Sequence, residues 1–402
     1  MAEHFEGSFT QQEPIPDDAI AAALEVLKSG RLHRYNTAPG ELGETALLEQ
    51  EFAAMVGAQY ALAVASGGYA LACALRAVGV APGDAVLTNA FTLAPVPGAI
   101  ASVGARPIFV EVTRDLTLDL EDLLAKAGTA RVLMLSHMRG HLCDMDRLME
   151  LCGGAGITVI EDCAHTMGAA WNGTPSGRHG HVGCFSTQTY KHINSGEGGL
   201  LISDDPEIMA RATLLSGSYM LYERHAAAPP PEYFEQPRWD MPNVSGRMDN
   251  LRAAILRPQL ANLPRQVAAW NERYRAVEKG LRGTPGLTVI ERPDAESIVG
   301  SSIQVLLEDW PGEKVEEVVA RCGQRGVELK WFGAPEPVAF TSKYDQWHYA
   351  KPNALPNSDA ILAGVLDMRL PLTFSVPDCH LIARIIREEV SRVFQSPAFL
   401  QP

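Results

Sequence analysis

Two charged residues and one glycine-rich turn in this sequence could do chemistry together. Lys191 lies between an apolar run and a glycine-rich turn, in CFSTQTYKHINSGEGGLL. Asp162 ends the apolar run of VIEDCAHTMGA, and Ser66-Gly67-Gly68 joins YALAVA to a helix-like segment. Each feature also has an ordinary explanation: most lysines are solvated, aspartate is a favoured helix N-cap, and a short glycine-rich turn indicates little on its own.

Taken together, the three features point to one cofactor. A small-residue turn at a helix N-terminus exposes backbone N–H groups at the positive end of the helix dipole, so it can hold a phosphate. A carboxylate at the end of a buried strand needs a cationic or hydrogen-bonding partner. A phosphate cradle, a buried carboxylate and a lysine are what pyridoxal 5′-phosphate (PLP) requires, since the carboxylate pairs with the ring nitrogen and the lysine forms a Schiff base.

The segments around these residues predict a mainly parallel sheet. Between about Gly57 and Ser203, short apolar runs such as AVLTNA, RPIFVEV and ITVIEDC alternate with helix-like stretches. The runs lack polar alternation, which indicates strands buried on both faces, and strand–helix alternation is typical of an α/β sandwich. Ligands of such sheets bind at the carboxyl ends of the strands. The turn lacks the G-x-G-x-x-G and GK[ST] patterns, which disfavours a dinucleotide or P-loop site.

The second half of the chain is organised differently. Ala226 to Arg238 contains four prolines, which predicts a long irregular loop. A helical pattern then runs from Met248, and Pro258 and Pro264 are expected to bend or break it. Further apolar runs and two helical patterns follow Gly286, which predicts a smaller α+β domain attached by the long helix.

Composition excludes several classes of protein. The chain has 402 residues and a net charge of −14, which argues against a nucleic-acid-binding protein. It contains no run of 18 apolar residues, and its polar, acidic N-terminus is not a signal peptide, so we expect a cytoplasmic protein that does not bind membranes. The seven cysteines show no zinc-binding spacing and are expected to be buried thiols. We predict no metal site.

Several stretches in colinear order make the chain similar to the DegT/DnrJ/EryC1/StrS family of PLP-dependent aminotransferases. The resemblance runs from about Arg34 to Leu372. Its main pieces are ASGGYAL at 65–71, VIEDCAHTMGA at 159–169, FSTQTYKHINSGEGG at 185–199, GRMDNLRAAI at 246–255 and RLPL at 369–372.

The resemblance implies a fold and a division into domains. It implies fold type I, with a mainly parallel seven-stranded sheet sandwiched by helices and a smaller C-terminal α+β domain. We expect the large PLP-binding domain to span residues 1–255, with an N-terminal arm over about 1–40, and the smaller domain to span 256–402. It further implies a homodimer with shared active sites, in which the segment around Arg247 reaches toward the partner.

The resemblance also implies site residues. Lys191 matches the Schiff-base lysine, Asp162 the partner of the ring nitrogen, and His165 the residue that hydrogen-bonds the cofactor's phenolic oxygen. The other expected cofactor contacts are Gly67, Gly68, Tyr69, Ser186 and Ser245, with either Phe91 or Leu93 covering the ring. The expected substrate contacts are Arg34, His137, Lys330 and Trp331, and Arg139, Arg178 and Arg224 are further candidate cations for an anionic acceptor.

Some positions depart from the family pattern. Gly68 replaces a threonine, which removes one hydroxyl from the phosphate site, and Ser245 replaces an asparagine. Lys330-Trp331-Phe332-Gly333 stands where the family often has an R-x-x-Y-x-P-like run. These changes leave the PLP chemistry in place and concern the choice of substrate.

The resemblance implies a ping-pong aminotransferase. The amino donor is expected to be L-glutamate or L-glutamine, and the acceptor a keto sugar, linked to a nucleotide. The altered KWFG segment motivates an alternative acceptor, namely an aminocyclitol ketone or another non-nucleotide keto compound. A third possibility is a non-catalytic, PLP-binding regulatory protein.

Overall fold

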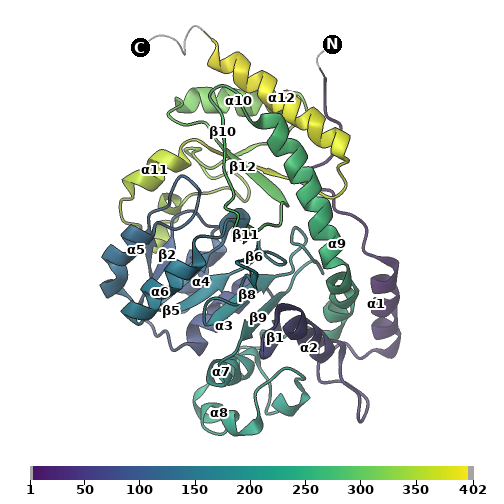
Figure 1. The fold of residues 1–402 in the computed structure, drawn as a ribbon. Coiled ribbons are helices and arrows are strands. Elements are labelled where there is room, and N and C mark those ends of the chain that lie inside the picture. Colours follow the sequence, from purple (N-terminus) through teal and green to yellow (C-terminus); the bar gives the residue numbers. More distant parts are fainter. Residues whose placement is uncertain (1–2, 397–402) are drawn as a thin grey trace.

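A seven-stranded sheet runs through the centre of the computed structural model, which describes residues 3–396 (Figure 1). Its strand order is β1-β9-β8-β5-β4-β2-β3. The strands are β1 (Tyr60–Val64), β2 (Ala85–Asn89), β3 (Arg106–Val110), β4 (Val132–Ser136), β5 (Thr158–Asp162), β8 (Val182–Ser186) and β9 (Gly199–Ser203).

Most of this sheet is parallel. The pairs β2–β3, β2–β4, β4–β5 and β5–β8 are parallel, whereas β9 pairs antiparallel with both β8 and β1. Alternate residues along β1 face different core clusters: Leu62 and Val64 face one side, and Ala61 and Ala63 face the other. The sheet is therefore buried on both faces, which explains its continuous apolar runs and confirms the mainly parallel α/β architecture predicted from the sequence.

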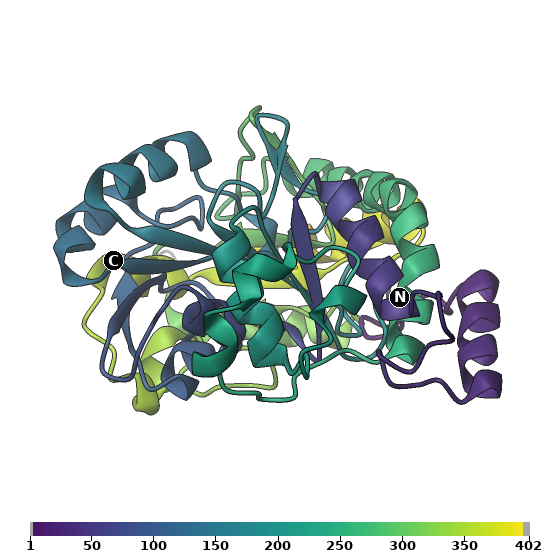
Figure 2. The same ribbon diagram turned by 90° about the horizontal axis from the view of Figure 1, so that it is seen from below.

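Helices cover both faces of the sheet (Figures 1 and 2). One face packs against α3 (Gly67–Ala77), α4 (Pro95–Ser102) and α7 (Pro206–Ser216). The other packs against α2 (Glu44–Val56) and α9 (Asn250–Leu281) on one half and against α6 (Met145–Ala155) and α5 (Leu120–Lys126) on the other half. Helix α1 (Asp17–Ser29) lies at the edge of the molecule in Figure 2, against α9.

A second, antiparallel sheet forms in the C-terminal part of the chain. Its order is β10 (Thr288–Val289), β12 (Ser302–Leu306), β14 (Val365–Arg369) and β13 (Lys330–Trp331). Helices α10 (Gly312–Gln324) and α12 (Val376–Phe394) pack on it, and α11 (Pro356–Leu362) lies to one side. A small three-stranded sheet joins β11 (Glu296–Ser297) to β6 (Ala170–Trp171) and β7 (Thr174–Pro175).

The N-terminal segment packs with this C-terminal part. Phe5 and Phe9 belong to its core, and both rings contact Phe374 at centroid distances of 4.9 Å. The predicted domain boundary after residue 255 falls inside α9, a helix that packs against α1, α2 and α12. The division at residue 255 therefore stays a prediction, and residues 1–2 and 397–402 of the two expected ranges lie outside the described residues.

Two expectations rested on prolines. Helix α9 continues through Pro258 and Pro264 as one helix of 32 residues, because packing along its length compensates for the lost backbone hydrogen bonds. The prolines therefore do not break the helix, and the expected bend stays a prediction. The expected loop from Ala226 to Arg238 contains a 3₁₀ turn at Pro231–Phe234 and leads into the one-turn helix α8 (Pro237–Asp240). Each of these turns begins with a proline. At the first position of a helical turn the backbone N–H has no partner within the helix, so a proline there removes no hydrogen bond.

Among residues 3–396, no helix is long and apolar enough to cross a membrane.

Candidate active site

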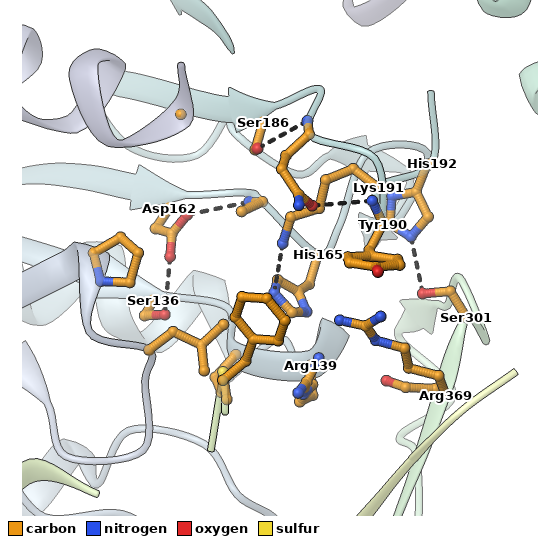
Figure 3. A pocket seen from close by; sticks show the side chains of 18 of the residues that line it. Ser136, Arg139, Asp162, His165, Ser186, Tyr190, Lys191, His192, Ser301 and Arg369 are labelled. Carbon is orange, nitrogen blue, oxygen red and sulfur yellow. Dashed lines mark hydrogen bonds between the residues drawn. The ribbon is translucent and has the colours of Figure 1, made fainter. Parts of the chain in front are cut away.

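One cavity of about 440 Å³ opens at the carboxyl ends of β4, β5 and β8 (Figure 3). The last residue of each strand lines it: Ser136, Asp162 and Ser186. The turn before α3 and the loop that carries Lys191 border the same space. The sheet therefore brings together the three features that the sequence singled out, at the edge where parallel α/β sheets bind ligands.

The Asp162 carboxylate is held at the floor of this cavity. Ser136 Oγ donates to Asp162 Oδ2 at 3.1 Å, and the backbone N–H of Ala164 donates to Oδ1 at 3.1 Å. The residue is only 9% exposed, and burial raises the pKa of its carboxyl, while Lys191 and the two donors oppose that rise. A cationic N–H from a bound ring would complete the partners of this carboxylate.

Lys191 is the only lysine that lines this cavity among the described residues. Its Nζ lies 2.9 Å from Nε2 of His165 (Figure 3). Burial lowers the pKa of Lys191 to about 7, and the charges of Arg139 and Arg369 act in the same direction. Burial and the nearby Lys191 also hold the pKa of His165 well below its usual value, so Nε2 of the neutral ring can accept an N–H from the lysine.

This pKa predicts how the apoprotein reacts with PLP. The neutral amine attacks an aldehyde, so the rate at which the visible band of lysine-bound PLP appears should rise up to about pH 7 and then level off. The ε-amine of free α-N-acetyl-lysine, with an ordinary pKa of about 10.4, should keep accelerating to higher pH. Stopped-flow absorption between pH 5.5 and 10 measures both rates. A protein rate that climbed steadily to pH 10 would contradict the lowered pKa.

The turn before α3 is shaped to hold an anion. Ser66 caps the helix, because its Oγ accepts the backbone N–H of Tyr69 at 3.0 Å. Gly67 and Gly68 are the first residues of α3 and line the cavity. A Cβ on Gly67 would lie 2.7 Å from Cβ of Ser186, so the turn and the end of β8 approach as closely as only glycine allows. Free N–H groups at a helix start beside the Ser186 hydroxyl fit a phosphate.

The two glycines predict different effects of substitution. Gly67→Ala should weaken PLP binding about tenfold or more, because the new methyl must push the Ser186 backbone away from the turn. Gly68→Ala is the matched control: its Cβ meets no atom closer than Ser66 Oγ at 4.0 Å, so affinity should stay within about threefold. Titration of each apoprotein with PLP measures both. Equal losses in the two variants would contradict the close approach of α3 and β8.

These groups fit PLP as a set. Phosphate donors lie at the start of α3, a buried carboxylate ends β5, and a lysine with a lowered pKa faces the same space. Bound PLP would supply an aldehyde and an electron-withdrawing ring to this cavity.

Seven of the predicted cofactor contacts line the cavity, and three do not. The seven are Gly67, Gly68, Leu93, Asp162, His165, Ser186 and Lys191. Of the two residues considered for covering the ring, Leu93 lines the cavity, whereas Phe91 is buried against Phe332 at a centroid distance of 5.1 Å. Tyr69 points away and donates its O–H to Leu215 O at 2.9 Å. Ser245 is exposed and bonds to Asn243, outside the cavity lining.

The four predicted substrate contacts lie outside the cavity lining. Arg34 is buried in the core, where it forms two 2.9 Å hydrogen bonds to the Glu49 carboxylate. Trp331 donates its indole N–H to Ala363 O at 2.7 Å, and Lys330 lies on the four-stranded sheet. Of the further candidate cations, Arg178 pairs with Asp204 and Arg224 donates to Tyr35 O, and only Arg139 lines the cavity.

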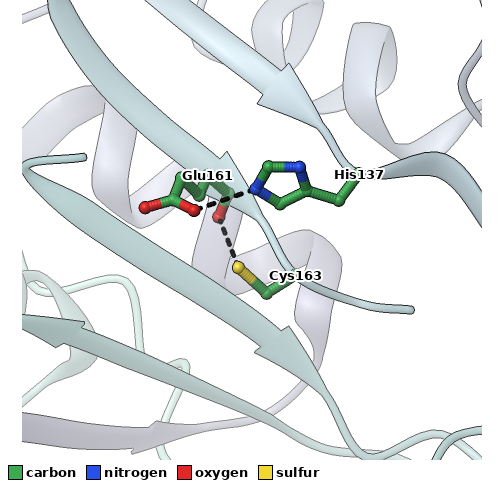
Figure 4. Close-up of side chains that lie close together, drawn as sticks. All are labelled: His137, Glu161 and Cys163. Atoms are coloured by element: carbon green, nitrogen blue, oxygen red, sulfur yellow. Dashed lines mark hydrogen bonds and ion pairs between the residues drawn. The ribbon is translucent and has the colours of Figure 1, made fainter. Parts of the chain in front are cut away.

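His137 is the fourth of the predicted substrate contacts. It belongs to a buried cluster with Glu161 and Cys163 (Figure 4). His137 Nε2 lies 2.9 Å from Glu161 Oε2, which also accepts the backbone N–H of Gly177. Glu161 Oε1 accepts two more backbone N–H groups, those of His179 and Gly180. The carboxylate is thus occupied by internal donors, and it ties the 177–180 turn to β5 beside Asp162. Glu161 therefore has a structural role.

Sequence reasoning missed several residues that line the cavity. They are Gln12, Ser136, Gln188, Tyr190, Trp270, Ser301, Phe340 and Arg369. Ser136 could have been found, because it ends an apolar strand next to the strand that ends in Asp162. Arg369 begins the RLPL stretch, whose likeness to the family does not by itself indicate a role for the arginine.

The fold and the site define a class. The sheet is mainly parallel, and it places a phosphate-binding turn, a buried carboxylate and a lysine at one edge. This arrangement defines a fold type I PLP enzyme. The chain belongs to the DegT/DnrJ/EryC1/StrS aminotransferase family, whose profile matches residues 15–386. It is an aminotransferase, and its cofactor is PLP.

Individual relatives span nearly the whole chain. It is 31% identical over 362 residues to 3-amino-5-hydroxybenzoate synthase of Amycolatopsis mediterranei (strain S699), covering 86% of this chain and 89% of that protein. It is 30% identical over 395 residues to dTDP-3-amino-3,4,6-trideoxy-alpha-D-glucose transaminase of Streptomyces venezuelae, covering 96% and 95%. A crystal structure of 3-amino-5-hydroxybenzoic acid synthase superimposes with a TM-score of 0.82 at 26% identity, covering 98% of this chain and all of that one.

Proposed function

We propose that this aminotransferase moves an amino group from L-glutamate or L-glutamine to a cyclic keto compound of the keto-sugar type. The observation that carries the proposal is the shared cavity of Lys191, His165 and Asp162, in a chain whose family is that of aminotransferases. One relative is named for a nucleotide-linked amino sugar, which supports a keto-sugar acceptor.

The residues would divide the work as follows. Lys191 Nζ takes a proton from the α-carbon of the donor and later returns one to the acceptor carbon, since a pKa of about 7 lets the amine do both near neutral pH. His165 Nε2 orients that amine between the two transfers. The Asp162 carboxylate holds positive charge at the ring nitrogen, which stabilises negative charge developing on the reacting carbon. Leu93, Met138 and Trp270 line the cavity and exclude water.

A second acceptor class is favoured by specific observations. The Trp331 side chain packs beside the C-terminal core and does not line the cavity, so this segment does not build a nucleotide-sugar wall there. The relative from Amycolatopsis is named for an amino-substituted hydroxybenzoate, which is not a sugar. A carbocyclic, non-nucleotide ketone is therefore the alternative.

The acceptor test uses protein loaded with pyridoxamine 5′-phosphate. Return of the visible band of lysine-bound PLP is followed after adding a dTDP-linked keto sugar or a free cyclitol ketone. Return with the dTDP sugar alone supports the keto-sugar acceptor, and return with the cyclitol alone supports the carbocyclic alternative. The band could fail to return with either acceptor, and the PLP-loaded protein could also keep its band when the amino donor is added. That combination would overturn the proposed activity and favour a non-catalytic PLP-binding protein.

We also propose that two copies of the chain form a homodimer with shared active sites. Trp239 is 74% exposed and Tyr219 58%, and Met220 and Val244 are exposed nearby in the same region of the chain. Arg247 lies there too, with its guanidinium 4.9 Å from the Tyr219 ring. Sedimentation equilibrium should give twice the chain mass, and Trp239→Glu should shift the protein toward the monomer. A wild-type protein that sediments as a monomer would contradict the dimer. The cytoplasmic location and the absence of nucleic-acid and membrane partners stay predictions.

A further inference from the structure

Two guanidinium groups line the active-site cavity, and neither has a role in holding PLP. Arg139 lies in the turn Met138–Gly140 that follows β4, and Arg369 is the last residue of β14. Figure 3 shows both on the side of the cavity away from Ser186. The Arg369 guanidinium lies over the Tyr190 ring, 3.8 Å from its centroid, so its plane is fixed beside Lys191.

Arg139 is held in an unusual way. It is only 6% exposed and has a φ of 56°, a left-handed conformation that residues with a side chain seldom adopt and that is concentrated at functional sites. Its Nη2 forms an ion pair with Asp367 Oδ2 at 2.8 Å, and neither Nη2 nor the buried Nε makes a hydrogen bond within the described residues. Buried donors without a hydrogen bond are costly, so the Arg139 guanidinium, which lines the cavity, has hydrogen-bonding capacity that the described residues leave unused.

The charges around these arginines do not balance. Asp367 and Arg369 lie two residues apart on β14 and so share one face of the sheet, and Lys330 is directly opposite Asp367 in the register with β13. Gln304 on β12 donates to Asp367 Oδ1 at 2.8 Å. One carboxylate, Asp367, thus faces three cations: Arg139, Arg369 and Lys330. Burial lowers the pKa of Lys330 to about 8, and both burial and Arg139 lower that of Arg369.

We propose that Arg139 and Arg369 form a subsite for a carboxylate group of the substrate, an inference that rests on the proposed aminotransferase function. A planar guanidinium fork matches a carboxylate. Arg139 is only 6% exposed, and a carboxylate is smaller than the diphosphate of a nucleotide, so we take a carboxylate as the group that the two arginines bind. The carboxylate belongs either to the amino donor or to a carboxylated cyclic ketone, and the experiment separates these sources.

The first arm measures binding without turnover. Benzoate, its neutral isostere benzamide, and UDP are titrated by calorimetry into the full-length, PLP-loaded protein. We expect benzoate to bind at least about tenfold more tightly than benzamide, and UDP not to compete with it. Equal affinities for benzoate and benzamide would overturn the proposal. UDP binding that the arginine variants weaken would overturn it in favour of a phosphate subsite.

The variants locate the effect. Arg369→Gln should weaken benzoate about tenfold or more and leave benzamide unchanged, and Arg369→Lys should lose less, because it keeps the charge but not the fork. Arg139→Gln is combined with Asp367→Asn, so that no buried carboxylate is left unpaired. The control is Arg282→Gln, which removes an exposed arginine paired with Glu278 at the end of α9. Benzoate binding equal in all variants, with unchanged thermal unfolding, would overturn the proposal.

The second arm identifies the source of the carboxylate. If the subsite serves the amino donor, Arg369→Gln slows the loss of the PLP band with L-glutamate by the same factor by which it weakens benzoate. If it serves the acceptor, that half-reaction stays within about twofold of wild type, and the defect appears only with a carboxylated ketone. Both results support a carboxylate subsite. If the protein forms no visible band with PLP, the proposed aminotransferase function is contradicted. Benzoate binding to the apoprotein then still tests the carboxylate subsite separately.

Discussion

Lys191→Ala is expected to reduce the turnover of amino transfer by about 10³-fold or more and to abolish the visible band of lysine-bound PLP. The variant loses both the amine that binds the aldehyde and the base that moves the proton, and each contributes a large factor. Within the described residues, no other lysine lines the cavity to replace it. Steady-state assays of the donor and acceptor half-reactions, together with the absorption spectrum, measure both effects.

A matched control separates this loss from a general effect of removing a lysine. Lys279 is exposed on α9 and does not line the cavity, so Lys279→Ala should leave both the band and the turnover unchanged. His165 should still hold its place in the Lys191 variant, so the protein should fold and bind PLP without the covalent link. A Lys191→Ala protein that kept near-normal turnover would contradict the catalytic role of this residue.

Asp162→Asn is expected to reduce turnover by about 10²-fold or more. The amide keeps the size of the side chain, and it can still accept from the Ala164 N–H and bond to the Ser136 hydroxyl, so the end of β5 should stay intact. What it lacks is the negative charge that holds a proton on the ring nitrogen, and such electrostatic stabilisation in a buried site is worth a factor of this size. Turnover, PLP affinity and thermal unfolding are measured together.

Two further variants serve as comparisons for the loss of turnover in Asp162→Asn. Asp115→Asn removes an exposed carboxylate away from the cavity and should change nothing. Ser136→Ala removes one of the two donors to Asp162 and should cost less than Asp162→Asn, because the charge of the carboxylate and the Ala164 N–H remain. An Asp162→Asn protein as active as Ser136→Ala would show that the charge of this carboxylate is not needed.

The cofactor end of the site could be predicted because its signals are local. Asp162 and Ser66 follow apolar strands directly, and parallel strands bring their carboxyl ends to one edge. Lys191 and His165 were placed by the likeness of their segments to the family. The structure brings all four to one cavity.

The substrate end could not be predicted because tertiary packing builds it. Arg369 comes from the C-terminal antiparallel sheet, and nothing in its own segment indicates that this sheet packs over the large one. Arg34 is a charged residue in a polar segment, and its burial against Glu49 depends on a helix that follows later in the chain. After β2, Phe91 and Leu93 lie in an irregular turn, where no periodicity says which residue faces the cavity.

The most direct test of the aminotransferase assignment is the absorption spectrum of the purified, PLP-loaded protein before and after adding L-glutamate or L-glutamine. The structure predicts a visible band of lysine-bound PLP that disappears with one of these donors as the pyridoxamine form appears, with one equivalent of keto acid released per site. No band after addition of PLP would contradict the role of Lys191. A band that ignores both donors would contradict the proposed amino donors.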